Sequence, residues 1–456
     1  MIRFRRLIKG MTALATAMIV AMTPLTGVQA AVTPEQAIAV GIDVSKYQGL
    51  IDWAQVKASG VSFAFVKIGS SKGMDPYADY NIKAALMNGI QTGVYVYSYA
   101  TTPEEAANEA ALTIAWLQNY NISFPVVIDI EDKVHKGLSM AQQQQVVMTF
   151  CAMIDAAGYY PMVYSSKNWY LTRLGDVPYD KWVAQYSTVC DYPGAVCVWQ
   201  KADTARIPGI AGNVDIDYLY KDYSNLIIPE GFINHYNYIR YYRNYKMQTG
   251  WIAVNGLKYH MDALGHMQFG WFSDESGTYY LAEDGHAVTG QNKVGAFDFY
   301  FDEHGRMQTG WVNIAGVKYF YDPATGAMVK GWLPTPNGNF FFDMTTGAMS
   351  IGAVNIGENS YFFDANGLMY TGLLDVGGVK FYYDTTSGAM VKNAFATNGI
   401  GIAYFAEDGH MVTGLTTIGK DMYLFDAAGT LLPNTYLPFE GGTIVTDEMG
   451  KVIFIG

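Results

Sequence analysis

A unit of 19 to 21 residues recurs along the second half of the chain, and this period limits the possible folds more than any other feature. In the clearest copy, GWVNIAGVKYFYDPATGAMVKG, an aromatic run alternates as a strand does, and a tight turn leads back into a second strand. Because a single hairpin is marginally stable, the period predicts a solenoid of about ten stacked hairpins over residues 231–456. The expected boundaries are Gly250, Gly270, Gly290, Gly310, Gly331, Gly352, Gly372, Asn393 and Gly414.

The first half of the chain alternates short β-branched or aromatic runs with amphipathic stretches. Its strand candidates lie near residues 41–44, 63–69, 92–98, 125–131, 161–165, 181–186, 196–201 and 214–219. Eight strands are the number that closes a small barrel. Early intervals such as 102–120 and 139–157 are long enough for crossover helices, whereas the last intervals are not. We therefore expect an irregular, helix-poor (β/α) barrel over residues 38–224, followed by an all-β hairpin-repeat solenoid.

The N-terminus has the pattern of a secretory signal peptide over residues 1–30. Basic residues precede an apolar run from Met11 to Met22, and the segment ends in Val28-Gln29-Ala30. This run is shorter than the roughly 20 residues that a membrane-spanning helix needs. We expect cleavage after Ala30, secretion to the bacterial cell wall and no stable membrane insertion afterwards.

Charge and cysteine content exclude several classes of function. The formal net charge of −12 disfavours binding to nucleic acid. Three cysteines are too few for a disulfide scaffold, and no Cys/His cluster has the spacing of a zinc site, so we expect no metal and no cofactor. Cys190 and Cys197 bracket a short loop, so their pairing is a hypothesis. Cys151 lies in a helical stretch that is typical of a buried thiol.

Acidic residues mark three of the strand candidates. Asp43 ends the first, Asp129 and Glu131 end the fourth, and Asp215 lies in the eighth. Side-chain alternation puts Asp129 and Glu131 on one side, and barrel closure makes the first and eighth strands neighbours. The four acids should then converge on one mouth, where a protonated carboxyl beside an ionised one can cleave a glycosidic bond. The alternative is that each acid caps a helix or binds backbone amides, but acids on separate strands favour a site.

Aromatic and amide side chains are expected at the same level of the barrel. The candidates for contact with a sugar are Tyr97, Tyr164, Tyr186, Trp199 and Gln200. Flat aromatic faces suit sugar rings, and core packing is the alternative for each ring.

The stretches GIDVSKYQGLIDW, FAFVKIGSS, PVVIDIED, VYSS, WVAQY, VWQ and GNVDIDYLY together resemble the catalytic domain of glycoside hydrolase family 25, the lysozymes that cut peptidoglycan. The resemblance implies an N-acetylmuramidase that hydrolyses the β-1,4 bond between N-acetylmuramic acid and N-acetylglucosamine. It implies Glu131 as proton donor, with Asp43, Asp129 and Asp215 as the other active-site acids. It also implies a retaining reaction, and the sequence leaves open whether the substrate's 2-acetamido group is the nucleophile. The longer Asp-x-x-Asp-x-Asp-x-Glu run of chitinase-like barrels is absent.

The repeats resemble cell-wall-binding repeats of the choline-binding and glucan-binding type. In choline-binding examples, aromatic side chains from adjacent hairpins form a cage for a quaternary ammonium. A tryptophan follows the boundary glycine in four units, as Trp251, Trp271, Trp311 and Trp332. Lysine replaces the second tryptophan of the cage pattern, so the polymer bound is left open between choline-substituted teichoic acid and glucan. We expect binding sites in the units up to about residue 345, with later units extending the array.

Two functions are compatible with these patterns. One is a secreted muramidase that cleaves peptidoglycan glycan strands and is held on the wall by the repeats. The other is a non-catalytic surface adhesin whose barrel is a relic. The four acids favour the muramidase, because a relic has little reason to keep charges that repel one another.

Overall fold

The structure is a computed structural model that describes residues 30–235, 237–397, 399, 401–439 and 441–455. The expected signal peptide lies outside the described residues, apart from Ala30. The chain divides into two compact units. The first runs to Gly270 and includes Leu281–Ala287, and the second contains Trp271–Tyr280 and the chain from Val288 onward. Within the described part of the chain, no helix has the length and apolar character to cross a membrane.

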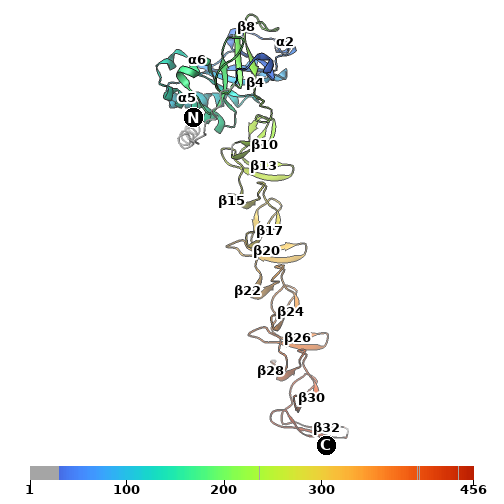
Figure 1. Cartoon of the computed structure of the whole chain (residues 1–456). Helices are drawn as coiled ribbons and strands as arrows, with labels where there is room; N and C mark the ends of the chain where they lie inside the picture. Colours follow the sequence, from blue (N-terminus) through green and yellow to red (C-terminus); the bar gives the residue numbers. More distant parts are fainter. Residues whose placement is uncertain (1–29, 236, 398, 400, 440, 456) are drawn as a thin grey trace. The chain divides into compact units, whose positions relative to one another are not determined.

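Eight strands close into a barrel in the first unit (Figure 1). They are β1 (Ala39–Val44), β2 (Phe63–Ser70), β4 (Gln91–Tyr97), β5 (Val126–Asp129), β6 (Pro161–Ser166), β7 (Asp180–Ala184), β8 (Val198–Ala205) and β9 (Val214–Leu219). The hydrogen-bonded order is β1-β9-β8-β7-β6-β5-β4-β2, and pairing of β1 with β2 completes the ring. A short strand, β3 (Gly73–Met74), pairs with β2 outside the ring. The structure thus confirms the predicted eight-stranded barrel.

The direction of the last strand was not foreseen. β9 is antiparallel to both of its neighbours, β1 and β8, whereas the other seven strands run parallel. The start of β9 therefore lies at the barrel end where the other strands finish. This direction places Asp215 opposite Asp43 in the register.

Helices lie between the early strands, as the sequence intervals predict. They are α2 (Trp53–Ala58), α3 (Ala78–Met87), α4 (Pro103–Leu117), α5 (Met140–Ala156) and the short α6 (Lys167–Trp169). The Thr102 and Ser139 side chains cap α4 and α5 by accepting hydrogen bonds from backbone N–H groups of the first turn. The described chain from β7 to β9 contains no helix, so the barrel is helix-poor on its closing side.

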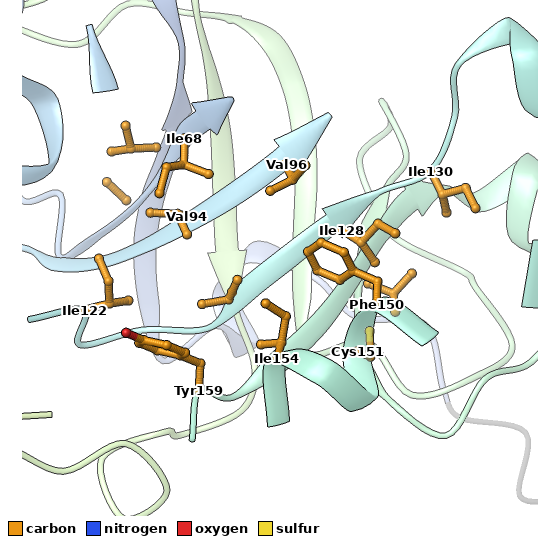
Figure 2. Packing of buried hydrophobic residues seen from close by; sticks show 14 of the residues in the cluster. Ile68, Val94, Val96, Ile122, Ile128, Ile130, Phe150, Cys151, Ile154 and Tyr159 are labelled. Atoms are coloured by element: carbon orange, nitrogen blue, oxygen red, sulfur yellow. The ribbon is translucent and has the colours of Figure 1, made fainter. Parts of the chain in front are cut away.

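Two apolar clusters hold the barrel together. The outer cluster packs helices against strands, and Figure 2 shows Ile128 of β5 beside Phe150 and Cys151 of α5. The inner cluster fills the barrel and includes Val127 and Trp182. Each large side chain buried in this way contributes about 1.5–3 kcal/mol to stability. Since Val127 faces inward and Ile128 outward, the alternation turns the side chain of the next residue, Asp129, toward the interior.

All three cysteines are buried free thiols. Cys190 packs in the outer cluster and Cys197 in the inner cluster. This placement contradicts the hypothesised disulfide between them, because strand β8 and its neighbours separate the two environments.

Eleven small sheets follow the barrel within the described residues. The first two are β10 (Glu230–His235) with β11 (Tyr238–Arg243) and β12 (Lys246–Met247), and β13 (Gly250–Val254) with β14 (Leu257–Met261). The next are β15 (Gly270–Asp274) with β16 (Gly277–Leu281), β17 (Gly290–Val294) with β18 (Phe297–Phe301) and β19 (Met307–Gln308), β20 (Gly310–Ile314) with β21 (Val317–Tyr321), and β22 (Gly331–Thr335) with β23 (Gly338–Phe342). The last are β24 (Gly352–Ile356) with β25 (Asn359–Phe363), β26 (Gly372–Val376) with β27 (Val379–Tyr383), β28 (Ala394–Thr397) with β29 (Ile402–Phe405), β30 (Gly414–Ile418) with β31 (Asp421–Phe425), and β32 (Tyr436–Phe439) with β33 (Gly442–Thr446) and β34 (Val452–Ile455). The predicted succession of hairpins is confirmed, with eleven sheets where about ten units were expected and with one boundary at Ala394 in place of Asn393.

A methionine and a glycine join successive hairpins. The backbone N–H of Met349 donates to the carbonyl of Lys318 in the preceding hairpin, at 2.8 Å. The Met349 side chain lies against Gly367 in the following turn, where any Cβ would overlap its Sδ. Met328 and Gly347 repeat this contact one unit earlier. The repeat period is therefore fixed by backbone hydrogen bonds and by a side chain that needs glycine opposite it.

Candidate active site

The barrel brings the four predicted acids to one mouth. Asp43 lies near the end of β1, Asp129 ends β5, Glu131 follows two residues later, and Asp215 lies near the start of β9. Asp43 and Asp129 are buried, whereas Glu131 and Asp215 are partly exposed. Burial raises the pKa of Asp43, and the negative charges of Asp217, Asp215 and Asp129 raise it further, so these groups are close enough to interact. The convergence expected from the sequence is present in the structure.

Glu131 has the environment of a proton donor. Burial raises the pKa of Glu131, and the negative charge of Asp215 raises it further. Burial raises the pKa of Asp215 itself to about 6, with a further contribution from the charge of Asp203. Among the described residues, no side chain or backbone group hydrogen-bonds to the Glu131 carboxyl. A partly exposed acid that keeps its proton and has no competing partner can donate that proton to a bound molecule.

Asp129 lies between a negative and a positive neighbour. Burial raises the pKa of Asp129 and so does the charge of Glu131, whereas the Lys67 ammonium lowers it. Lys67 projects from β2, with its Nζ 4.6 Å from the ring centroid of Tyr97. Sequence analysis missed Lys67. Lys67 lies two residues after the inward-facing Phe65, so the alternation of side chains along the strand could have predicted that Lys67 also points into the barrel.

Asp43 is held by a chain of polar side chains. Gln200 Nε2 donates to Asp43 Oδ2 at 2.7 Å, and Tyr164 OH donates to Gln200 Oε1 at 2.8 Å. Tyr186 OH donates to the same Gln200 oxygen at 3.3 Å from a largely exposed position. Gln200 and Tyr164 are buried, so their clearest role is to orient Asp43. Tyr186 keeps an accessible ring face.

The two remaining candidates for sugar contact differ in exposure. Tyr97 is half-buried at the mouth, and its OH donates to Asp132 Oδ2 at 3.0 Å. Trp199 is fully buried in the outer cluster, and its Nε1 donates to the carbonyl of Gln185. A ring without accessible surface has no face for a sugar, which corrects the expectation for Trp199.

Across the described residues, no group of three or more His, Cys, Asp or Glu side chains is arranged to hold a metal ion.

The predicted tryptophans of the repeats lie at junctions between hairpins. Trp311 contacts the cross-strand Phe320 at 5.1 Å and two rings of the next hairpin, Phe340 at 5.0 Å and Phe342 at 5.7 Å. We call this arrangement an aromatic junction. Trp271 and Trp332 form aromatic junctions of the same kind. The exposed fractions of Trp271, Trp311 and Trp332 are 48%, 48% and 40%, so each retains free surface.

Trp251 and a later unit depart from this pattern. Trp251 contacts His260 at 5.1 Å, where the other tryptophans meet a phenylalanine or tyrosine. Beyond residue 345, Phe395 contacts Tyr404 at 4.9 Å and Tyr423 at 5.3 Å, and it is 41% exposed. The sequence predicts the unit boundary at Asn393, which would put Ala394 in the tryptophan position. Ala394 pairs with Phe405 as Gly310 pairs with Tyr321, because the segment before this hairpin is one residue longer, so Phe395 takes the tryptophan position.

Known proteins resemble the barrel in sequence. The sequence model described as Glycosyl hydrolases family 25 matches residues 42–210. The uncharacterized protein YegX of Escherichia coli O157:H7 is 32% identical over 189 residues, which are 39% of this chain and 68% of that protein. The chain belongs to glycosyl hydrolase family 25. The family match contains Asp43, Asp129 and Glu131 and ends before Asp215.

Other similarities cover both halves of this family 25 protein. Lysozyme M1 of Streptomyces globisporus is 29% identical over 197 residues, which are 38% of this chain and 65% of that protein. The structure of the modular autolysin LytC from Streptococcus pneumoniae, in complex with a synthetic peptidoglycan ligand, is 29% identical with a TM-score of 0.38, over 40% of this chain and 46% of that one. The sequence model described as Choline-binding repeat matches residues 288–331, 308–352 and 350–395. The chain therefore combines a family 25 lysozyme domain with C-terminal choline-binding repeats.

Proposed function

We propose that this protein is a secreted peptidoglycan hydrolase that cleaves the β-1,4 bond between N-acetylmuramic acid and N-acetylglucosamine. The barrel over residues 38–224 carries the reaction, and the repeats over residues 231–456 hold the enzyme on the wall. The observation that supports this most directly is the convergence of four acids at one mouth, with Glu131 partly exposed and its pKa raised. Membership of family 25 supports the same class of substrate.

Glu131 acts as general acid and then as general base. Its carboxyl gives a proton to the glycosidic oxygen as the bond to the muramic acid ring breaks. The resulting carboxylate takes a proton from the water that completes hydrolysis, which restores the acid. Asp129, whose charged form Lys67 favours, orients or polarises the 2-acetamido group of the substrate. Asp215 keeps the pKa of Glu131 high, so the proton remains available at higher pH.

Wall attachment is assigned to the aromatic junctions. Each offers a partly exposed aromatic face, and the match to choline-binding repeats favours a choline-substituted teichoic acid over a glucan. Several weak sites on one chain give a combined affinity far above that of one site. Retention of the protein on choline–agarose and its release by free choline would support choline as the ligand. Retention on a glucan matrix alone would show that the ligand is a glucan instead.

Release of reducing sugar from purified peptidoglycan tests the catalytic proposal. We expect the full chain to release reducing ends at a rate proportional to enzyme concentration. A folded protein that binds the wall and releases none would instead be the non-catalytic adhesin. Secretion is tested separately, because signal cleavage after Ala30 predicts a mature N-terminus at Ala31.

A further inference from the structure

Asp217 is a buried acid for which the proposed reaction has no use. It lies on β9, opposite Gly41 of β1 and Gln200 of β8, and its side chain is 0% exposed. Because Asp215 and Asp217 are two residues apart on a strand, both point into the barrel, with Asp217 one step further from the mouth.

A tryptophan anchors one oxygen of this acid. Trp182 Nε1 donates to Asp217 Oδ1 at 2.8 Å. The Trp182 ring is itself fixed, because it stacks on Phe65 at 4.5 Å and meets Tyr164 edge-on at 4.5 Å. The position of Asp217 is therefore set by the aromatic core of the barrel.

Within the described chain, the other oxygen of Asp217 has no such anchor, and Asp43 lies diagonally across the ladder of β1 and β9 from this acid. Among the described residues, no N–H or hydroxyl group donates to Asp217 Oδ2, although that atom is fully buried. Its carboxyl interacts directly with that of Asp43. Asp217 is also the neighbour whose charge most strongly raises the pKa of Asp43. Two buried carboxyls in contact repel strongly when both are ionised, so the pair retains a proton.

The other charged groups around the pair do not relieve this repulsion. Asp215 faces both acids and Asp129 acts on Asp43, and both add negative charge. The Lys67 ammonium lowers the pKa of the neighbouring Asp129. On the opposite side, the Gln200 amide donates to Asp43.

We infer that Asp217 is a positioning residue that shares one proton with Asp43, and that the resulting hydrogen bond fixes the Asp43 carboxyl at the floor of the mouth. Trp182 holds the pair from one end and Gln200 from the other. The pair carries one negative charge in place of two, and Asp43 keeps a single orientation toward the substrate. This role in catalysis rests on the proposed function, whereas the shared proton does not.

Two substitutions separate the shared proton from simple packing. In Asp217→Asn the amide can still donate to Asp43 and accept from Trp182, so we expect reducing-end release within about threefold of the original protein. In Asp217→Leu the branching and the number of side-chain heavy atoms are kept but both hydrogen bonds are lost. We expect about tenfold or greater loss of activity, because the Trp182 N–H is left without an acceptor and the Asp43 carboxyl is held by Gln200 alone.

Stability as a function of pH gives a readout that needs no activity. The folded pair keeps a proton that the unfolded chain releases above about pH 4, so the original protein loses stability as pH rises beyond that point. Asp217→Asn removes this loss. Its melting temperature should match that of the original protein near pH 4 and exceed it by several degrees at pH 7. Asp222→Asn makes the same charge change at an exposed acid and should give no such gain.

The outcomes distinguish this inference from the proposed function. A pH-independent stability difference for Asp217→Asn, together with an activity loss as large as that of Asp217→Leu, would overturn the shared proton. If Asp217→Leu fails to fold, the comparison of Asp217→Asn with the original protein still tests whether Asp217 and Asp43 share a proton. If the original protein releases no reducing ends, the proposed function fails, and the melting experiment tests the shared proton independently.

Discussion

At the scale of single residues, the proton of Glu131 depends on the charge of a neighbour. Burial raises the pKa of Glu131, and the negative charge of Asp215 raises it further. In Asp215→Asn that charge is absent, so the pKa of Glu131 falls and the proton is lost at lower pH. We expect the alkaline limb of the pH–activity profile to move to lower pH, with activity on the acid side within about threefold.

Asp203→Asn is the matched control for this experiment. The charge of Asp203 raises the pKa of Asp215, so its removal lets Asp215 stay ionised at lower pH and keeps Glu131 under its influence. The alkaline limb should then stay in place or move to higher pH. Identical downward movement in both variants would contradict the coupling between Asp215 and Glu131.

The site residues differ in how far sequence could predict them. The four acids were predictable because they lie at the ends or starts of strands, and barrel closure makes those places meet. Trp199 was misassigned because it lies next to Gln200, and adjacent residues on a strand face opposite sides. The sharing of a proton between Asp217 and Asp43 depends on contact across β1 and β9, which spacing along the chain does not reveal.

At the scale of elements, glycines opposite methionines set the stacking of hairpins. Gly347 has φ +72°, and a Cβ there would overlap Met328 Sδ. Gly352 has φ +73° with no atom within 4 Å of a Cβ. We expect Gly352→Ala to cost about 1 kcal/mol of backbone strain, and Gly347→Ala to cost about 1–3 kcal/mol more.

Thermal unfolding and limited proteolysis of the full chain measure this difference. The array should be cut near residue 347 in Gly347→Ala under conditions that leave Gly352→Ala intact. Equal melting and cleavage in the two variants would show that the methionine contact does not determine stacking.

The aromatic junction at Phe395 is expected to contribute to binding of the cell wall. Because it has the form of the tryptophan junctions, Phe395→Ala should weaken binding of the full chain to cell walls by about two- to tenfold. Phe297→Ala is the control, since Phe297 is 60% exposed on a hairpin and no aromatic junction includes it. Unchanged binding in Phe395→Ala would restore the expectation that sites end near residue 345.

Element positions were easier to predict than element directions. The eight strand ranges and the hairpin period follow from local alternation and from glycine spacing. The antiparallel course of β9 was not predictable in this way, because strand direction depends on how a short connection returns across the barrel end. The extra residue in the segment before Ala394 likewise changes the spacing of boundary residues by only one, so the boundary was predicted at Asn393.

At the scale of the whole molecule, the first hairpins belong to the compact unit of the barrel. Arg240 is almost fully buried, and its guanidinium lies 3.0 Å from the carboxylate of Asp155 on α5. Lys246 Nζ donates to the carbonyl of Gln118 after α4, and Met247 packs against Gly158. These contacts attach the hairpins to helices of the barrel.

Truncation tests this attachment. A chain ending at residue 224 loses the buried Arg240 and exposes the surface beneath it, whereas a chain ending at residue 288 keeps the whole first unit. We expect the shorter chain to melt at least several degrees lower, because removing one member of a buried ion pair with its packing costs about 3 kcal/mol or more. Equal melting temperatures would show that the barrel is stable without the hairpins.

The central claim is that Glu131 donates the proton for cleavage at the muramic acid residue. The most direct test treats purified peptidoglycan with the full chain, reduces the new ends with borohydride and identifies the reduced sugar. We predict that the new ends are the alcohol of N-acetylmuramic acid, and that folded Glu131→Gln protein releases less than about one-hundredth as many. Ends that carry reduced N-acetylglucosamine, or full release by Glu131→Gln, would contradict the account.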